Sequence, residues 1–216
     1  MKHILTGILV SLLPLSAALA QSEYDKQARQ ILDAMSEHYQ AIGAYEADFS
    51  YSMEIPDQPQ ADKFEGQIAV KGDKFRLNMG GQEVINDGTT QWTYLEEANE
   101  VNIDNYDPEE GDISPTQIYN AYQRGFKYVY VEDETIDGKA YQVVDLIPEN
   151  KDNQFFKIRL HISQEDKVLK RWKIFEKNGT RYTYDINNFN PEAPVDDELF
   201  TFNKRKHRGV EVVDLR

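Results

Sequence analysis

The chain of 216 residues carries 24 Lys and Arg against 38 Asp and Glu, so its formal net charge is −14. A field of this sign makes double-stranded nucleic acid and anionic membrane surfaces poor partners. The chain contains no cysteine, which excludes a disulfide framework, thiolate chemistry and a thiol for lipid attachment.

The first twenty residues have the layout of a secretory signal peptide. Lys2 provides a basic start, residues 4–15 form an apolar run, and Ala18-Leu19-Ala20 has the small residues of a signal-peptidase site. We predict a signal peptide over residues 1–20 and a single mature domain over residues 21–216. The apolar run is shorter than the roughly 20 residues of a membrane-spanning helix, so we expect a soluble protein outside the cytoplasm.

A helical pattern opens the mature chain, and an alternating pattern follows it. Apolar residues recur at helical spacing over residues 22–42, with Ser22 and Asp25 available as caps and Gly43 just past the end. Residues 45–53 then alternate apolar and polar side chains, which predicts a strand with one apolar face.

The same alternation recurs along the rest of the chain. It predicts strands over residues 64–70, 75–79, 92–94, 101–103, 126–131, 141–147, 155–162, 168–176 and 181–188. A second helix is predicted over residues 114–125, with Pro115 at its first position and Gly125 at its end. The fold class is therefore mainly β with helices (α+β), an antiparallel meander of about 10–11 strands.

Two short helices cannot cover one apolar face of so large a sheet. Either the sheet curls on itself, or something else fills the space. We interpret the pattern as a curled sheet that encloses a partly empty apolar cavity, with the helices as a plug. Trp92 and Tyr94 are expected to face this cavity. The alternative is that both are ordinary core or cross-strand partners.

Five segments stand in a recognisable order along the mature chain. They are YEADFSYSM, FEGQIAVKGDKFRLNM, EVINDGTTQWTYLEEANEV, FFKIRLHISQEDKVLKRWKIFEKNGTRYTYDINNF and ELFTFNKRKHRGVEVVD. This ordered set resembles the periplasmic outer-membrane lipoprotein carrier proteins of the LolA family. The most specific part is NDGTTQWTY after an EG strand, combined with a late FTF before a closing GVEVV.

The resemblance implies an open, unclosed β-barrel whose concave side is covered by helices. It implies a periplasmic carrier that binds the acyl chains of lipoproteins in a hydrophobic cavity and escorts them from the inner to the outer membrane. The implied partners are acylated lipoproteins, an ATP-driven release complex in the inner membrane and an outer-membrane acceptor, and the carrier is expected to be a monomer. Burying an acyl chain is worth about 0.8 kcal/mol per methylene, so such chains cannot cross water unescorted.

The candidate cavity wall consists of large apolar side chains on the alternating strands and one on the second predicted helix. They are Phe49, Tyr51, Ile68, Val70, Phe75, Leu77, Met79, Trp92, Tyr94, Ile118, Ile158, Leu160 and Tyr184. One position departs from the family. The resemblance implies an arginine that holds the helical lid closed, and Gly72 stands at its place in VKGDKF. How the lid closes is therefore left open.

No motif indicates a catalytic or metal centre. Histidine pairs with metal-ligand spacing are absent, and DNYDPEEGD lacks the positions of a calcium loop. A Ser-centred elbow and a phosphate-binding glycine loop are also absent. We therefore expect no enzyme, no cofactor and no metal. Two alternatives are a hydrolase that uses a carboxylate pair on sugars, and a noncatalytic envelope module of the same fold that binds or senses a lipid or a protein.

A basic cluster near the C-terminus contrasts with the acidic chain. It comprises Lys204, Arg205, Lys206, His207 and Arg208. One interpretation is a solvated loop between the last two strands. The other is a docking patch for an acidic partner, formed by Lys204, Arg205, Lys206 and Arg208.

Overall fold

The computed structural model describes residues 16–58, 62–107 and 116–216. Most of the predicted signal peptide lies outside these residues, as do Ser114 and Pro115 of the predicted second helix.

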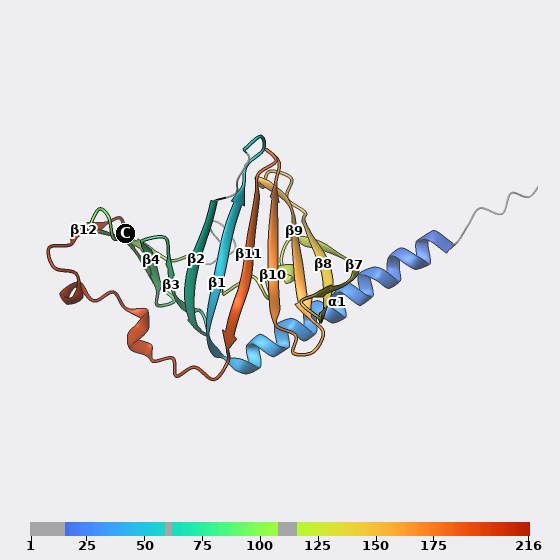
Figure 1. Cartoon of the computed structure of the whole chain (residues 1–216), viewed down its shortest axis with the longest axis horizontal. Helices are drawn as coiled ribbons and strands as arrows, with labels where there is room; N and C mark the ends of the chain where they lie inside the picture. The colour runs from blue at the N-terminus through green and yellow to red at the C-terminus, as the bar shows by residue number, and fades with distance from the viewer. Residues whose placement is uncertain (1–15, 59–61, 108–115) are drawn as a thin grey trace, which may run out of the picture.

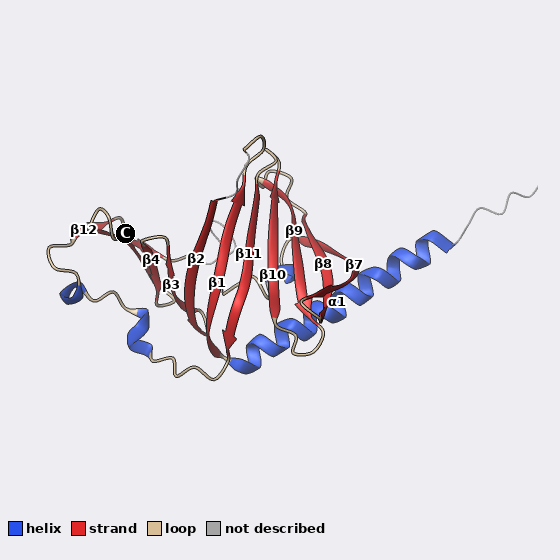
Figure 2. Ribbon diagram, viewed as in Figure 1, coloured by secondary structure: helices blue, strands red, loops and turns tan. Residues whose placement is uncertain are grey.

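One large sheet dominates the described part of the chain, accompanied by one α-helix, α1 (Ser16–Ile42) (Figures 1 and 2). The strands are β1 (Ala44–Glu54), β2 (Asp62–Lys71), β3 (Lys74–Met79), β4 (Gln82–Asn86), β5 (Thr90–Leu95), β6 (Glu100–Asn105), β7 (Phe126–Ile136), β8 (Lys139–Pro148), β9 (Phe155–Ser163), β10 (Leu169–Glu176), β11 (Arg181–Asn190) and β12 (Glu211–Asp214). Three short 3₁₀ helices are η1 (Ala121–Gln123), η2 (Asp197–Phe200) and η3 (Lys204–Lys206).

The sheet consists of two antiparallel meanders joined at its centre. Its order is β12-β6-β5-β4-β3-β2-β1-β11-β10-β9-β8-β7, and the two meanders meet where β1 pairs with β11. Because β7 and β12 are at opposite ends of this order, the sheet is not closed. The prediction of a mainly β, open sheet is confirmed. Two details differ, since the sheet has twelve strands and β12 lies parallel to β6.

The helices differ more from the prediction. Helix α1 begins at Ser16, not at Ser22, and the segment predicted as a second helix forms turns over residues 116–120 followed by η1. A helix of about ten residues is marginal without strong packing, and Tyr and Asn are weak helix formers. Contacts of Tyr119 and Tyr122 with α1 determine the shape of this segment instead. Coverage of the sheet by helices is therefore only partial.

The main core lies between α1 and one face of the sheet, which we call the inner face. Helix α1 contributes Ala28, Ile31, Leu32, Met35 and Tyr39, which recur at helical spacing, and β8 and β9 contribute Val144, Leu146, Ile158, Leu160 and Ile162. Leu146 is in register with Ile158, and Val144 with Leu160, so these side chains share one face. All ten of these residues are buried.

The opposite, outer face carries a second, smaller core under the segment of residues 191–210, which we call the C-terminal strap. The strap leaves the end of β11 and leads to β12 at the far edge of the sheet (Figure 1). Phe200 of the strap is buried and packs in a cluster with Ala193, Val195, Leu199, Ala44 and Ala69. Arg76 on β3 donates from Nη1 to the carbonyl oxygen of Leu199 at 3.1 Å, which fastens the strap to the sheet.

Candidate functional site

A cavity of about 690 Å³ opens along the inner face. This volume lies within the roughly 300–1,000 Å³ that is usual for small-molecule sites. Most of the lining is aromatic or aliphatic: Tyr39, Tyr45, Ala47, Phe49, Tyr51, Ile68, Leu77, Met79, Ile118, Phe155, Ile158, Leu169, Trp172, Ile174, Tyr182, Tyr184, Ile186 and Phe189. The remaining lining residues are Asp152, Asn153, Gln154 and Glu176.

The register of the central strands brings the aromatic rings of the lining together. Tyr51 on β1 is in register with Tyr184 on β11, which is in register with Trp172 on β10. The ring centroids of Tyr51 and Tyr184 are 4.9 Å apart, and the rings of Trp172 and Tyr184 stack at 4.5 Å with an interplanar angle of 8°. All three residues are only half-buried, so the rings border open space.

Gly66 leaves room for one wall residue. It lies between Phe49 on β1 and Met79 on β3 in the register of the sheet. A Cβ atom at Gly66 would lie 2.4 Å from Cζ of Phe49 and 2.9 Å from the carbonyl oxygen of Asn78. The ring of Phe49 therefore occupies the space that any larger residue at position 66 would need.

Tyrosines tie α1 to the structure around the cavity. The backbone N–H of Leu169 donates to Oη of Tyr39 at 3.2 Å, and Tyr39 stacks on Tyr119 with centroids 4.9 Å apart. Tyr122 donates from Oη to Oδ1 of Asp33 on α1 at 2.6 Å. Burial raises the pKa of the Tyr39 phenol well above its usual value, so this residue is neutral where it anchors the helix.

Gly72 lies in the tight turn between β2 and β3. It has no side chain with which to contact α1. Its backbone has φ of +60°, its N–H donates to the carbonyl oxygen of Gly43 at 2.9 Å, and a Cβ would point into open space. A positive φ at this value favours glycine over arginine. Packing in the main core and the hydrogen bonds of Tyr39 and Asp33 hold α1, and no arginine stands at this position.

The predicted wall residues fall into three groups. Eight of them line the cavity: Phe49, Tyr51, Ile68, Leu77, Met79, Ile118, Ile158 and Tyr184. Val70, Phe75 and Leu160 are buried in the adjoining core and do not border the cavity. Trp92 and Tyr94 lie elsewhere.

Trp92 and Tyr94 are on the outer face, so their predicted place in the cavity wall is corrected. Leu77 is in register with Val84, and Val84 with Thr93, so Thr93 shares the inner face with Leu77. Trp92 is in register with Ile85 and Ile103 on the outer face, where Ile85 is fully buried. The sequence holds a signal for this arrangement. Gly80-Gly81 and Gly88-Thr89 lie in two short turns, and counting residues through both places Trp92 and Leu77 on different faces of the sheet.

Several lining residues were not predicted. Tyr39, Tyr45 and Trp172 continue the periodicities of the predicted helix and strands, so the apolar pattern contained a signal for them. Asp152, Asn153 and Gln154 lie in the loop between β8 and β9, where no periodicity applies.

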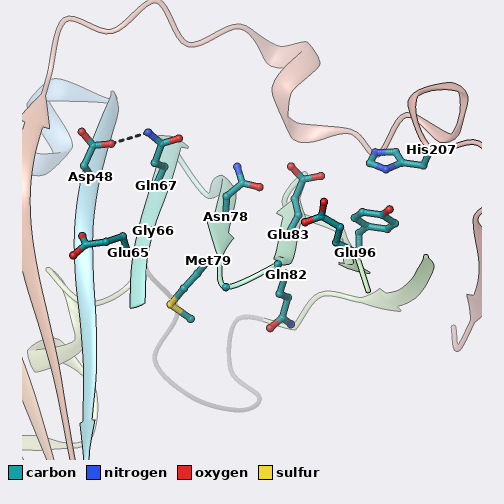
Figure 3. A pocket seen from close by; sticks show the side chains of 13 residues that line it. Asp48, Glu65, Gly66, Gln67, Asn78, Met79, Gln82, Glu83, Glu96 and His207 are labelled. Carbon is teal, nitrogen blue, oxygen red and sulfur yellow. Dashed lines mark hydrogen bonds between the residues drawn. The ribbon is translucent and has the colours of Figure 1, made fainter. Parts of the chain in front are cut away.

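A second hollow of about 700 Å³ lies on the outer face and has the opposite character (Figure 3). Asp48, Gln67, Asn78, Glu83 and Tyr94 are neighbours on five successive strands, and Gln67 donates from Nε2 to Oδ1 of Asp48 at 3.0 Å. The side chains of Asn78 and Glu83 point away from those of their neighbours Met79 and Gln82 in Figure 3. With four carboxylates in its lining (Asp48, Glu65, Glu83 and Glu96), this hollow does not suit an apolar ligand.

The basic cluster lies on the C-terminal strap and does not contribute to the cavity. Lys204, Arg205, Lys206 and Arg208 are exposed. The backbone beneath them is fixed, because Oδ1 of Asn203 accepts from the N–H of Arg205 at 3.0 Å and Nδ2 of Asn99 donates to the carbonyl oxygen of Arg208 at 3.3 Å. His207 packs between Tyr94 and Phe202, with ring centroids at 4.3 and 4.7 Å.

The described residues contain no group of three His, Cys, Asp or Glu side chains placed to hold a metal ion. Among the helices in the same part of the chain, none combines the length and the apolar character needed to cross a bilayer.

Comparison with known proteins identifies a matching family and solved structures of similar fold. The family model for the outer membrane lipoprotein carrier protein LolA matches residues 40–203. An uncharacterized conserved protein from Thermus thermophilus superposes with a TM-score of 0.60 at 12% identity, over 87% of this chain and 99% of that one. MucB superposes with a TM-score of 0.50 at 16% identity, over 87% of this chain and 66% of that one. A LolA superfamily protein from Nitrosomonas europaea gives a TM-score of 0.45 at 15% identity, over 81% and 97% of the two chains. No curated protein sequence matches the chain. At these identities the likeness to solved structures concerns the fold alone.

Proposed function

We propose, since this chain belongs to the family of the outer membrane lipoprotein carrier protein LolA, that it binds the acyl chains of lipoproteins in the inner cavity. It carries them through the periplasm from the inner to the outer membrane. The observation that supports this most directly is the cavity of about 690 Å³ with its aromatic and aliphatic lining. Each methylene buried there contributes about 0.8 kcal/mol, which offsets the cost of removing the chain from a membrane.

The wall suits binding that is reversible. Tyr51, Leu77 and Met79 are half-buried, so they can change rotamer without breaking a close-packed core. Met79 in particular has a flexible side chain that adapts to ligands of different shape. A carrier needs this property, because it must accept many acyl chains and release each of them.

The partners follow from this role. An ATP-driven release complex in the inner membrane would load the carrier, and an outer-membrane acceptor would receive the cargo. The exposed basic cluster on the C-terminal strap is the proposed docking patch for an acidic surface of such a partner. The proposal assigns a monomer, no cofactor and no catalytic step.

The test uses a matched pair of variants on β3. Leu77→Glu places a charge in the cavity wall. Asn78→Glu places the same charge at the adjacent position, which is exposed on the outer face of the sheet. The mature protein is mixed with vesicles that carry a fluorescent triacylated lipopeptide, and the vesicles are removed by centrifugation. Wild type and Asn78→Glu should keep lipopeptide in the supernatant, and Leu77→Glu should keep little.

The proposal fails if wild type leaves all lipopeptide in the vesicles, or if Leu77→Glu retains as much as wild type. A second step adds acceptor vesicles to the loaded protein. A protein that binds lipopeptide and never transfers it would act as a sensing module of the same fold and not as a carrier.

A further inference from the structure

Four polar residues of the inner cavity lie together at one end of it, which we call the mouth because Asp152 and Gln154 are exposed there. Asp152, Asn153 and Gln154 come from the β8–β9 loop, and Glu176 ends β10. The carbonyl oxygen of Gln154 accepts from the N–H of Lys177 at 2.9 Å, which holds this loop beside the end of β10. The described lining therefore includes two carboxylates, and it includes no Lys, Arg or His.

Both carboxylates are available to a ligand. Neither Asp152 nor Glu176 forms an ion pair with another described residue, and the carboxylate of Glu176 accepts a hydrogen bond from Nδ2 of Asn178 at 2.9 Å. Two ammonium groups in and just after β10 have partners other than these carboxylates. Nζ of Lys177 donates to the carbonyl oxygen of Lys151, and Nζ of Lys173 lies 3.2 Å from Oε1 of Glu54.

Aromatic rings stand beside these carboxylates. Tyr51 and Tyr182 lie with centroids 6.1 Å apart and nearly parallel planes, next to the stacked pair of Trp172 and Tyr184. Burial, followed by the charges of Tyr182 and Glu176, raises the pKa of Tyr51, so Glu176 lies within electrostatic reach of this ring cluster. Ring faces attract cations and give no comparable attraction to anions.

We propose that the mouth of the cavity selects amphiphiles with a positively charged head group. This inference rests on the proposed function of the cavity as an acyl-chain site. The apolar chain lies along the inner face, and an ammonium group lies at the mouth between Asp152, Glu176 and the rings. A long-chain carboxylate brings a like charge to the same place and is repelled.

Three probes of equal chain length test the selection: dodecyltrimethylammonium, dodecanol and dodecanoate, each titrated at neutral pH below its micellar concentration. Binding is measured by calorimetry. The ammonium compound should bind roughly 10-fold more tightly than dodecanoate, with dodecanol between them. The double variant Asp152→Asn/Glu176→Gln should bring the two charged probes to within roughly 2-fold of each other.

Glu165→Gln is the matched control, because Glu165 is exposed in the turn between β9 and β10 and does not line the cavity. It should retain the preference of wild type. If wild type binds dodecanoate as tightly as the ammonium compound while dodecanol binds, the head-group selection is overturned and the acyl-chain site stands. If the double variant keeps the full preference, the two carboxylates are not its source, which also overturns the inference. If dodecanol does not bind at all, the proposed function itself fails, and this inference fails with it.

Discussion

The centre of the sheet and the region of β4–β6 bury apolar side chains on opposite faces. Around the centre, β1, β3 and β9–β11 direct Leu77 and its neighbours to the inner face, where a cavity remains. At β4–β6, Ile85 and Val101 are fully buried on the outer face, on the side of the C-terminal strap. A strand with one apolar side therefore indicates that one face of the sheet is covered. The segment that covers it determines whether the space between them is close-packed or remains a cavity.

The two regions also differ in what covers them. On the outer face the strap supplies bulky side chains such as Phe200, which is 1% exposed. On the inner face α1 packs in the main core with β8 and β9, and the segment of residues 116–123 contacts α1 through Tyr119 and Tyr122. These segments leave the rings of Tyr51 and Trp172 beside open space. Substitutions at filled sites of the outer face should thus reduce stability, and substitutions at half-buried residues of the cavity should mainly affect ligand binding.

The largest effect is expected from neighbouring residues of β4 with opposite orientation. Ile85→Asp buries a carboxylate at a fully buried site, which should cost about 4 kcal/mol or more of unfolding free energy and leave the protein unfolded. Val84→Asp places the same group on the inner face at a half-buried position, where water reaches it, and should cost much less. Urea denaturation followed by circular dichroism measures both. Equal losses would show that the two faces of β4 are packed alike.

A smaller effect is expected at Gly66 on the inner face. In Gly66→Ala the new Cβ meets the ring of Phe49 and also the backbone oxygen of Asn78, which cannot rotate away. Overpacking of this kind typically costs about 1–3 kcal/mol. Combining it with Phe49→Leu should recover part of the loss in a denaturation experiment. No recovery would mean that the contact with the backbone, and not the ring, limits the site.

Alkaline pH should weaken the attachment of α1. Burial raises the pKa values of Tyr39 and Tyr45 above the ordinary value near 10, so the unfolded chain loses these protons first as the pH rises. The stabilisation is complete below about pH 9 and falls above about pH 10, by up to about 1.4 kcal/mol per pH unit for each tyrosine. Urea midpoints measured between pH 8 and 11 should fall more steeply for wild type than for Tyr45→Phe. Parallel curves would exclude Tyr45 as a source of the effect.

The smallest effect on stability is expected from two separate variants, Trp92→Phe on the outer face and Trp172→Phe on the inner face. Trp172 lines the cavity and Trp92 does not, so binding of dodecanol should shift the emission of Trp172 only. Trp92→Phe should retain the ligand-dependent shift, and Trp172→Phe should lose it while still binding the ligand by calorimetry. A shift that follows Trp92 would reverse our assignment of the faces.

Much of the sheet could be predicted from the sequence because alternation is a local property. The alternations that begin at Tyr45 and at Phe156 predicted β1 and β9. They also predicted three cavity residues on these strands, Phe49, Tyr51 and Ile158. Alternation within one strand does not say which face is the inner one. In β4 the adjacent Val84 and Ile85 are both apolar, so only the register through the β3–β4 and β4–β5 turns assigns Trp92 to the outer face.

Other features depend on contacts that no local pattern contains. The segment that begins at Thr116 has helical spacing, yet stacking of Tyr119 on Tyr39 and the hydrogen bond of Tyr122 to Asp33 shape it differently. The carboxylates at the mouth of the cavity come from a loop and a strand end, where side-chain direction follows from the fold. The parallel position of β12 likewise depends on the path of the whole strap.

The central pairing of the sheet has a consequence for how the chain assembles. Residues 46–54 of β1 pair with residues 181–190 of β11, so the first strand, which pairs with β2 on one side, finds its second partner only near the end of the chain. Such distant pairing must close a long loop before it gains any contact energy, and folds built in this way form slowly. Until β11 arrives, β1 is an open edge with unpaired backbone groups and a row of exposed aromatic rings. The chain is therefore most exposed to aggregation and proteolysis during synthesis, before the strand that completes the centre of the sheet has been made.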